Sequence, residues 1–261
     1  MKNDMLGREP SLPGNGLDQV EIQLLLGQIS LDKGDFAHAF EMFAVAAQSG
    51  QPRALNMLGR VYERGWGVER SVARALDYFE AAAQGGDGWA DFNIADLYLA
   101  GDGVPRNVER AYEHYLRAAR RGVAKALNML GLMHEKDLPG GPDPDGARLF
   151  FEAAAQGGDC WACLNMGRLC LDGNDMQAAA RWFERSLPLG FAQYWLALER
   201  VLADADNAVF QNILIEARRR RMASEGGTAN RERAGCPPPS QVWSRQRYLE
   251  MASKACPQNI R

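Results

Sequence analysis

The sequence predicts an all-α protein in which antiparallel helix pairs stack into an α-solenoid. Four segments follow one another in a step of 36 residues, beginning at Ala54, Ala90, Ala126 and Ala162. Each segment has small and aromatic residues at helical spacing, and most have a turn rich in Gly and Pro between their two halves. Because each repeat packs on its neighbours, 261 residues can form such a solenoid as one domain.

The first half of each repeat is predicted to be a helix. If Ala54 is position zero, apolar or small residues lie at positions zero, four, five and eight. At about 100° per residue these positions form one stripe along a helix. Gly59, at position five, has low helix propensity. We therefore expect the second helix to approach closely there, with Phe79 or its equivalent as the neighbour.

The second half of each repeat also has helical spacing. In the second repeat, Ala75, Phe79, the pair Ala82 and Ala83, and Gly86 are separated by intervals that place them on one helix face. A closing glycine suits the left-handed residue that ends many helices. The same spacing recurs in the other repeats, starting from Ala39, Ala111, Ala147 and, more loosely, Ala179.

The ends of the chain depart from the repeat. A degenerate first copy lies upstream, where Gly27 corresponds to Gly59, and the first and fifth copies are shortened in the same turn. Beyond Gly190 the chain predicts a sixth copy whose second helix has lost the Ala-Ala pair and caps the solenoid. The predicted organisation is a flexible N-terminus (1–17), a solenoid (18–203), a capping helix (204–223), a linker (224–240) and a short helix with a tail (241–261).

The recurring pattern A-x₃-L-G-x₂-Y-x₂-G-x-G-V, followed by A-x₃-[FY]-x₂-A-A-x₂-G, resembles the Sel-1-like repeat family, a relative of the tetratricopeptide repeats. The resemblance covers roughly residues 20–203. It implies a right-handed superhelix of about five helix pairs that serves as an adaptor scaffold. The sequence departs from the pattern in the turn EKDLPGGPDPDG and at Ala95, which replaces a glycine.

Composition and charge bear on the environment of the protein. The net charge is −3, but the chain from Asp204 onward is basic and the preceding residues are acidic. These opposite charges leave open whether the tail folds back onto the solenoid as a regulator. No apolar run is long enough to span a membrane, and the N-terminus has no secretion signal. Five cysteines in a clustered, odd set fit a reducing compartment, so we expect a cytoplasmic protein.

The sequence shows no catalytic constellation. His38, His114 and His134 occupy different places in different repeats, so the repeat symmetry does not bring them together. Cys160 and Cys163 have the spacing of a metal or redox pair, but zinc would need a second pair. We therefore predict no enzyme, no metal or cofactor, and no small-molecule substrate. The alternative is a hydrolase or metal-dependent enzyme that uses these cysteines and a histidine.

A nucleic-acid partner is a further alternative, because Arg218, Arg219, Arg220 and Arg221 are consecutive and basic side chains bind phosphates. Four consecutive residues of a helix point all round it, however. A solvated helix end is the reading that the sequence favours, and the C-terminal position of these charges suits the helix dipole.

We expect the partner to be a protein or peptide held on the concave face, which the first helices of the repeats line. Positions two, three, six and nine point away from the apolar stripe. The candidate partner-binding residues are Asn56, Arg60 and Glu63; Phe92, Asn93 and Asp96; Asn128, Leu132 and Glu135; and Leu164, Asn165 and Arg168.

Two features of this set carry the hypothesis. Each of these repeats has an asparagine, whose amide both donates and accepts hydrogen bonds and so suits a peptide backbone. Phe92, Leu132 and Leu164 are predicted to be exposed anchors. In the alternative reading the asparagines pack between the helices of one repeat, and Leu164 packs on the next copy. The predicted function is a protein-binding scaffold; the family resemblance also admits an immunity or chaperone protein that neutralises a bacterial toxin or effector.

Overall fold

The computed structural model describes residues 18–136, 140–203 and 207–228. These residues form helices joined by turns and contain no strand. The predicted flexible N-terminus, most of the predicted linker and the predicted C-terminal helix and tail lie outside the described residues. The helices are α1 (Gln19–Lys33), α2 (Phe36–Ala47), α3 (Pro52–Arg64), α4 (Val72–Gln84), α5 (Gly88–Ala100), α6 (Val108–Arg120), α7 (Ala124–Lys136), α8 (Pro144–Gln156), α9 (Cys160–Asp172), α10 (Met176–Ser186), α11 (Ala192–Val201) and α12 (Ala208–Thr228).

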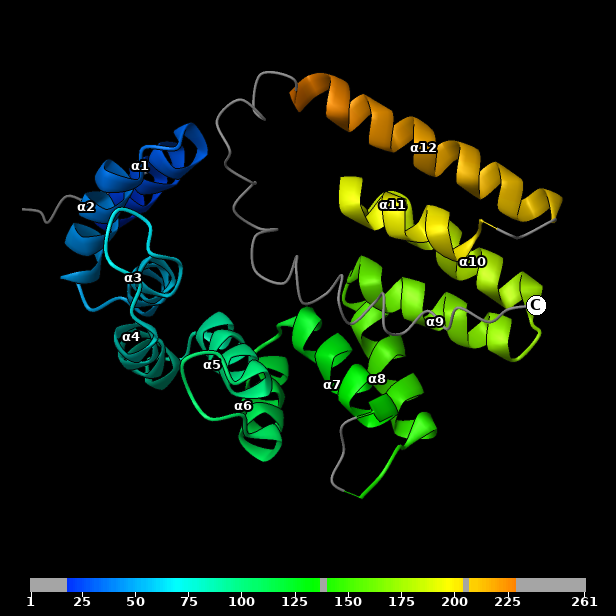
Figure 1. The fold of residues 1–261 in the computed structure, drawn as a ribbon, viewed down its shortest axis with the longest axis horizontal. Coiled ribbons are helices and arrows are strands. Elements are labelled where there is room, and N and C mark those ends of the chain that lie inside the picture. The colour runs from blue at the N-terminus through cyan, green and yellow to red at the C-terminus, as the bar shows by residue number, and fades with distance from the viewer. Residues whose placement is uncertain (1–17, 137–139, 204–206, 229–261) are drawn as a thin grey trace, which may run out of the picture.

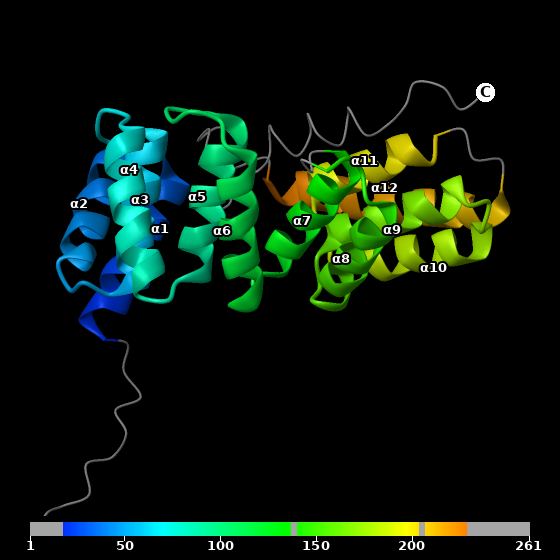
Figure 2. The ribbon, with the colours of Figure 1, turned by 90° about the horizontal axis from the view of Figure 1, so that it is seen from below.

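The helices form six antiparallel pairs that stack into an open arc (Figure 1). Along the first four pairs, the first helix (α1, α3, α5 and α7) lies on the inner side of the arc and the second on the outer side. In the view turned by 90°, α3 and α4 run almost vertically whereas α9 and α10 lie almost horizontally (Figure 2). The helix direction therefore rotates along the arc, as in a superhelix. The predicted α-solenoid is confirmed.

Side-chain caps define where the helices begin. Asp87 precedes α5, and its carboxylate accepts hydrogen bonds from the backbone N–H groups of Trp89 (2.8 Å) and Ala90 (3.3 Å). Asp159 precedes α9 and accepts from the N–H of Ala162 (2.8 Å). Such caps satisfy donors that have no partner within the helix. They also fix the first turns of α5 and α9, on which the candidate site depends.

Within a repeat, the two helices meet at the predicted glycine. A Cβ atom at Gly59 would lie 2.6 Å from the ring of Phe79, so only glycine allows the ring to pack this closely. The same contact joins Gly27 to Phe43, Gly131 to Phe151 and Gly167 to Phe183. In the third repeat Ala95 replaces the glycine and Tyr115 the phenylalanine; the Tyr115 hydroxyl donates to Asp96. The prediction of a close approach at this position is confirmed.

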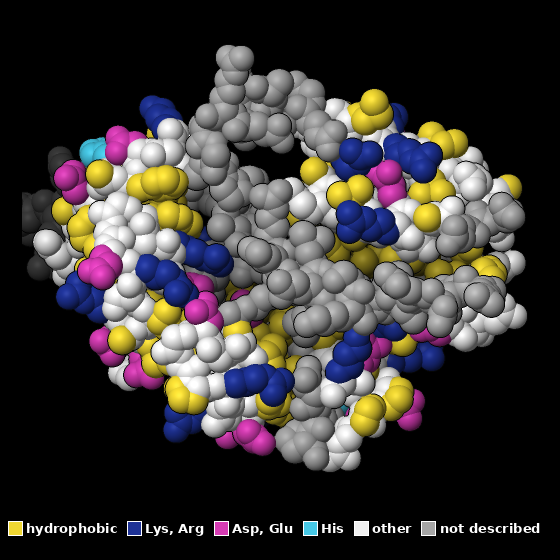
Figure 3. Space-filling view, in the orientation of Figure 1, with side chains coloured by type: hydrophobic (Ala, Val, Ile, Leu, Met, Phe, Trp, Pro, Cys, Tyr) yellow, Lys and Arg dark blue, Asp and Glu magenta, His cyan; other side chains and the backbone are white. Residues whose placement is uncertain are grey.

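The two ends of the solenoid differ. At the C-terminal end, α12 packs on α11 and α10 and buries Phe210, Ile213, Leu214 and Ala217. This helix continues to Thr228 and so enters the range predicted as linker. At the N-terminal end, α1 leaves an apolar stripe exposed, and hydrophobic side chains are visible on that arm (Figure 3). The stripe consists of Ile22, Leu25, Leu26 and Ile29.

Candidate partner-binding site

A pocket of about 770 Å³ lies between α3 and α5, at the inner helices of the second and third repeats. Met57, Arg53 and Arg60 of α3 line one part of it. The turn that contains Asp87 and leads into Trp89 lines another. The Trp89 side chain is 48% exposed, which is unusual for so large an apolar group. We call this the Trp89 pocket.

Asparagine side chains join neighbouring repeats, and one such pair, Asn56 and Asn93, is buried beside this pocket. The Asn93 side chain donates to the side-chain oxygen of Asn56 (2.8 Å), and Asn56 also hydrogen-bonds Asp87. Two repeats further on, Asn165 donates to Asn128 (2.9 Å). The asparagines therefore link one repeat to the next, whereas the alternative reading of the sequence placed them between helices of one repeat. Because buried amides need such partners, these bonds also fix the register of neighbouring repeats.

The prediction that Phe92, Leu132 and Leu164 are exposed is wrong. All three are buried, and the Phe92 ring packs edge-on against Trp89 (centroids 5.6 Å apart) and Tyr115 (5.5 Å). The physical reason is that an inner helix packs against two outer helices, as α5 does against α6 of its own repeat and α4 of the preceding one. More of its surface is therefore covered than one apolar stripe implies. The ring that packs on Phe92 from outside its own helix is that of Tyr115, on the outer helix α6 of the same repeat.

The other predicted groove residues are also buried or half-buried. Glu63 and Asn128 are buried, whereas Arg60, Asp96, Glu135, Asn165 and Arg168 are partly exposed. The Arg168 guanidinium forms an ion pair with Glu135 of the preceding repeat. Several of these side chains are thus engaged within the chain. Partner contact by the twelve residues stays a prediction.

The residue immediately before the first alanine of each repeat, helical position minus one, was not among the residues predicted to bind a partner. Arg53 and Trp89 occupy it, immediately before the first alanine of their repeats. At about 100° per residue this position lies almost directly opposite the centre of the apolar stripe, so it faces the inside of the arc. A signal was present in the sequence: the motif Asp-x-Trp-Ala starts at Asp87 and again two repeats later at Asp159.

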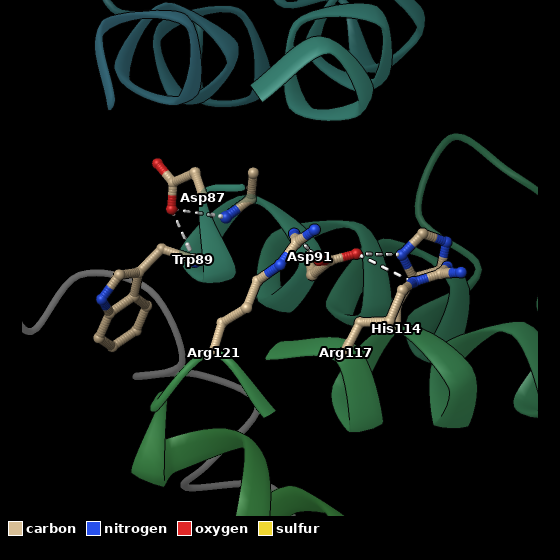
Figure 4. Close-up of polar contacts among 7 residues, drawn as sticks. Asp87, Trp89, Asp91, His114, Arg117 and Arg121 are labelled. Carbon is tan, nitrogen blue, oxygen red and sulfur yellow. Dashed lines mark hydrogen bonds and ion pairs between the residues drawn. The ribbon is translucent and has the colours of Figure 1, made fainter. Parts of the chain in front are cut away.

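A charged cluster anchors the first turn of α5 to α6 (Figure 4). The Asp91 side chain is only 2% exposed and contacts His114 Nδ1 (2.9 Å), Arg117 Nε (3.3 Å) and Arg121 Nη1. A buried carboxylate is tolerated only with such partners. Figure 4 shows Trp89 and Asp91 leaving the turn in different directions. Asp91 thus holds the turn in place while Trp89 projects away from the cluster.

Burial changes the ionisation of two groups that line the pocket. It lowers the pKa of Arg60 to about 9, an effect that nearby Glu63 opposes. Arg60 thus stays charged at neutral pH, with Nη1 3.4 Å from Met57 Sδ and its guanidinium carbon 5.7 Å from the centre of the Trp66 ring. Burial raises the pKa of Asp87, against the hydrogen bonds from Trp89, Ala90 and Asn56. The pocket therefore combines apolar surface with a poorly solvated cation.

The residues proposed for the enzyme alternative are not arranged as a nucleophile and its base. Burial raises the pKa of Cys163 to about 11 and that of Cys160 still further, so both thiols are neutral at physiological pH. His134 contacts Asp143 (2.9 Å) and the hydroxyl of Tyr112 (3.2 Å). In the described ranges, no group of three or more His, Cys, Asp or Glu side chains is placed to hold a metal ion.

The arginines of α12 are paired with glutamates. Arg218 and Arg221 contact Glu199 (3.4 and 2.8 Å), and Arg219 and Arg220 contact Glu216 (both 2.7 Å). Basic side chains gather on the C-terminal arm, but an acidic one lies among them (Figure 3). This pairing reduces the charge offered to a nucleic acid. Among the described helices, none combines the length and hydrophobicity that a membrane span requires.

The comparisons with known proteins agree with this architecture. The chain belongs to the Sel1 repeat family, whose sequence profile matches residues 52–87, 90–123, 124–159 and 162–187. A comparison with curated proteins found no significant match.

Solved structures support the same fold. The chain is similar to a Sel1 repeat protein from Oxalobacter formigenes (TM-score 0.64, 23% identity, 81% of this chain and 91% of that one). It is also similar to c5321, a protective antigen present in uropathogenic Escherichia coli strains that has an SLR fold. Here the TM-score is 0.57 and the identity 23%, and the match covers 91% of this chain and 54% of that one. A third similar structure is the immunity protein Pa5087 from Pseudomonas aeruginosa, with a TM-score of 0.59 and 19% identity. The match covers 80% of this chain and 84% of that one. At these identities the likeness concerns the fold.

Proposed function

We propose that the protein is a scaffold that holds an extended segment of a partner protein along the inner side of the arc. The observation that carries this proposal is the Trp89 pocket, whose volume of about 770 Å³ is in the range of ligand-binding pockets. A half-exposed Trp beside exposed and half-buried arginines has the composition of an interface hot spot.

The surrounding contacts support a rigid site. The Asn56–Asn93 bond joins the two repeats that form the pocket, and the Asp91 cluster fixes the turn that carries Trp89. A site whose side chains are held in place before binding loses less conformational entropy when the partner arrives. Raised thiol pKa values and the engaged histidines give no corresponding support to an enzyme.

The test is a selection of peptides from a random library of 12-residue sequences against the full chain, followed by fluorescence-anisotropy measurement of the selected peptides. Met57→Glu places a charge in the pocket and should reduce affinity at least tenfold. Leu149→Glu is the matched control, because Leu149 is exposed on the outer helix α8. The proposal would be contradicted by peptides whose affinity falls with Leu149→Glu and is unchanged with Met57→Glu.

A narrower form of the proposal is an immunity or chaperone protein that neutralises a bacterial toxin or effector. The similarity to the immunity protein Pa5087 motivates it, although this likeness extends to the fold alone. Here the partner is a protein encoded beside this chain. Co-expression of the two should rescue growth if the neighbour is toxic, and a neighbour without toxicity would remove this form of the proposal.

A further inference from the structure

The first helices of the internal repeats have a face that the preceding repeat covers. α3 packs against α2, and α5 packs against α4, the second helix of the repeat before it. Positions zero, four and seven of α3 and α5 are buried, and none of these side chains is more than 4% exposed. They are Ala54, Leu58 and Val61 in α3, and Ala90, Ile94 and Leu97 in α5.

In α1 the same positions are apolar but open to solvent. When the repeats are aligned through the glycine of the first helix, the counterparts are Ile22, Leu26 and Ile29. They are 39%, 42% and 39% exposed, and the neighbouring Leu25 is 51% exposed. The terminal repeat of a solenoid needs a polar outer face to stay soluble, and grouped exposed apolar side chains mark an interaction site. The α1 stripe therefore has the surface that another helix would cover.

We propose that the α1 stripe binds the α1 stripe of a second copy of this chain, with the two α1 helices antiparallel. The stripe is its own complement, because its exposed positions read Ile-x-x-Leu-Leu-x-x-Ile in both directions. A two-fold axis between Leu25 and Leu26 sets Ile22 of each copy against Ile29 of the other. A surface that matches itself in this way is what a closed dimer with two-fold symmetry requires.

The charges at the two ends of α1 complement each other in this arrangement. Asp18 caps the start of α1, Lys33 is its last residue, and both are exposed. At about 100° per residue, both lie within the sector of the α1 stripe. The two-fold axis places Asp18 of each copy beside Lys33 of the other, whereas parallel helices would set like charges together. The remaining carboxylate at that end, Asp32, lies opposite Gln19 and accepts a hydrogen bond from Gln28 (3.1 Å).

The dimer would join two arcs at their N-terminal ends. Of the residues of α1, Gln28 alone lines the Trp89 pocket, and it is not part of the α1 stripe, so both pockets stay accessible. The inference is thus independent of the proposed function. One helix pair buries less surface than the roughly 1,600 Å² of a standard interface. We therefore expect a weak dimer, with a Kd on the order of 10 μM.

Analytical ultracentrifugation of the full chain, between about 1 and 200 μM, measures this equilibrium. The wild type should change from monomer to dimer across the range. Leu25→Glu places two carboxylates together at the axis and should weaken dimerisation about tenfold or more. Ile215→Glu is the matched control, because Ile215 is 62% exposed on α12, at the other end of the solenoid. It should dimerise like the wild type, and circular dichroism checks that both variants are folded.

Cysteine crosslinking tests the antiparallel register. The variants Ile22→Cys and Ile29→Cys are mixed and oxidised with copper phenanthroline, and the crosslinked peptides are identified by mass spectrometry. A crosslink between positions 22 and 29 of different copies should form in preference to a crosslink between two identical positions. The wild-type chain, oxidised in the same way, controls for the native cysteines.

Three results would overturn the inference. The first is a wild type that stays monomeric up to the highest concentration, and the second is a dimer that Leu25→Glu leaves intact. The third is a preference for crosslinks between identical positions. Growth into larger assemblies that Ile215→Glu abolishes would instead indicate a head-to-tail contact between α12 and α1, and would also overturn the closed pair. None of these results bears on the Trp89 pocket, whose test is the peptide selection.

Discussion

The third and fifth repeats begin with the same motif but surround it differently. In the third repeat, Asp91 follows the motif and is enclosed by His114, Arg117 and Arg121. In the fifth, the equivalent residue is Cys163, which is buried among small apolar side chains. The comparison shows that the repeat geometry determines the position of a side chain. The residues packed around that position determine whether it is exposed, buried among polar groups or buried among apolar ones.

The two tryptophans provide the largest expected contrast. Trp161→Ala removes a buried ring that packs against Phe191 and Tyr194, and should lower the free energy of unfolding by about 3–5 kcal/mol. Trp89→Ala should lower it by no more than about 1 kcal/mol, because half of this side chain is already in contact with water. Urea unfolding followed by far-UV circular dichroism measures both. Equal losses would show that the two motifs are not in different environments.

The polar cluster provides the next contrast. Asp91→Ala removes the buried carboxylate that Arg117 and Arg121 share. Because both arginines are partly exposed, water can solvate them in the variant, so the free energy of unfolding should fall by about 2 kcal/mol, the value of the lost charged hydrogen bonds. Cys163→Ala, at the equivalent position, removes one small group and should cost about 1 kcal/mol. Urea unfolding again measures both variants. A Cys163→Ala protein less stable than Asp91→Ala would contradict this prediction.

The helix contact within each repeat gives the smallest contrast. In Gly167→Ala the new methyl group would overlap the Phe183 ring, so the variant should lose about 1–3 kcal/mol even though alanine favours helix. The reverse change in the third repeat, Ala95→Gly, should cost about 1 kcal/mol, because Tyr115 already packs beside a methyl group there. Thermal melts of both variants test this, and a stabilised Gly167→Ala protein would contradict it.

Most of the fold could be predicted because its determinants are local. The spacing of alanines and aromatic rings predicted the helix pairs, and the low propensity of Gly59 predicted the contact with Phe79. These inferences need only one repeat and the geometry of a helix. The predicted end of the capping helix was less accurate, since Thr228 lies beyond it and helix ends carry weaker signals.

The candidate site was predicted less well because it depends on neighbouring repeats. A helical wheel treats Phe92 as outward-facing, but Phe92 is buried, with the rings of Trp89 and Tyr115 packed against it. Trp89 and Trp161 have the same local sequence, so no local pattern distinguishes the exposed ring from the buried one. The difference arises at Val123 and Phe191, about thirty residues after each motif. It becomes visible only when the repeats are compared with one another.

The stacking of the helices has a kinetic consequence. The main contacts of each helix are with those that precede and follow it in the chain, such as α4 with α3 and α5. Native contacts between residues close in sequence form rapidly, because little chain entropy is lost when they close. During synthesis each new pair can therefore dock on the pair already made. The arc is expected to grow from α1 towards α12 as the chain leaves the ribosome, with no need to wait for the C-terminus.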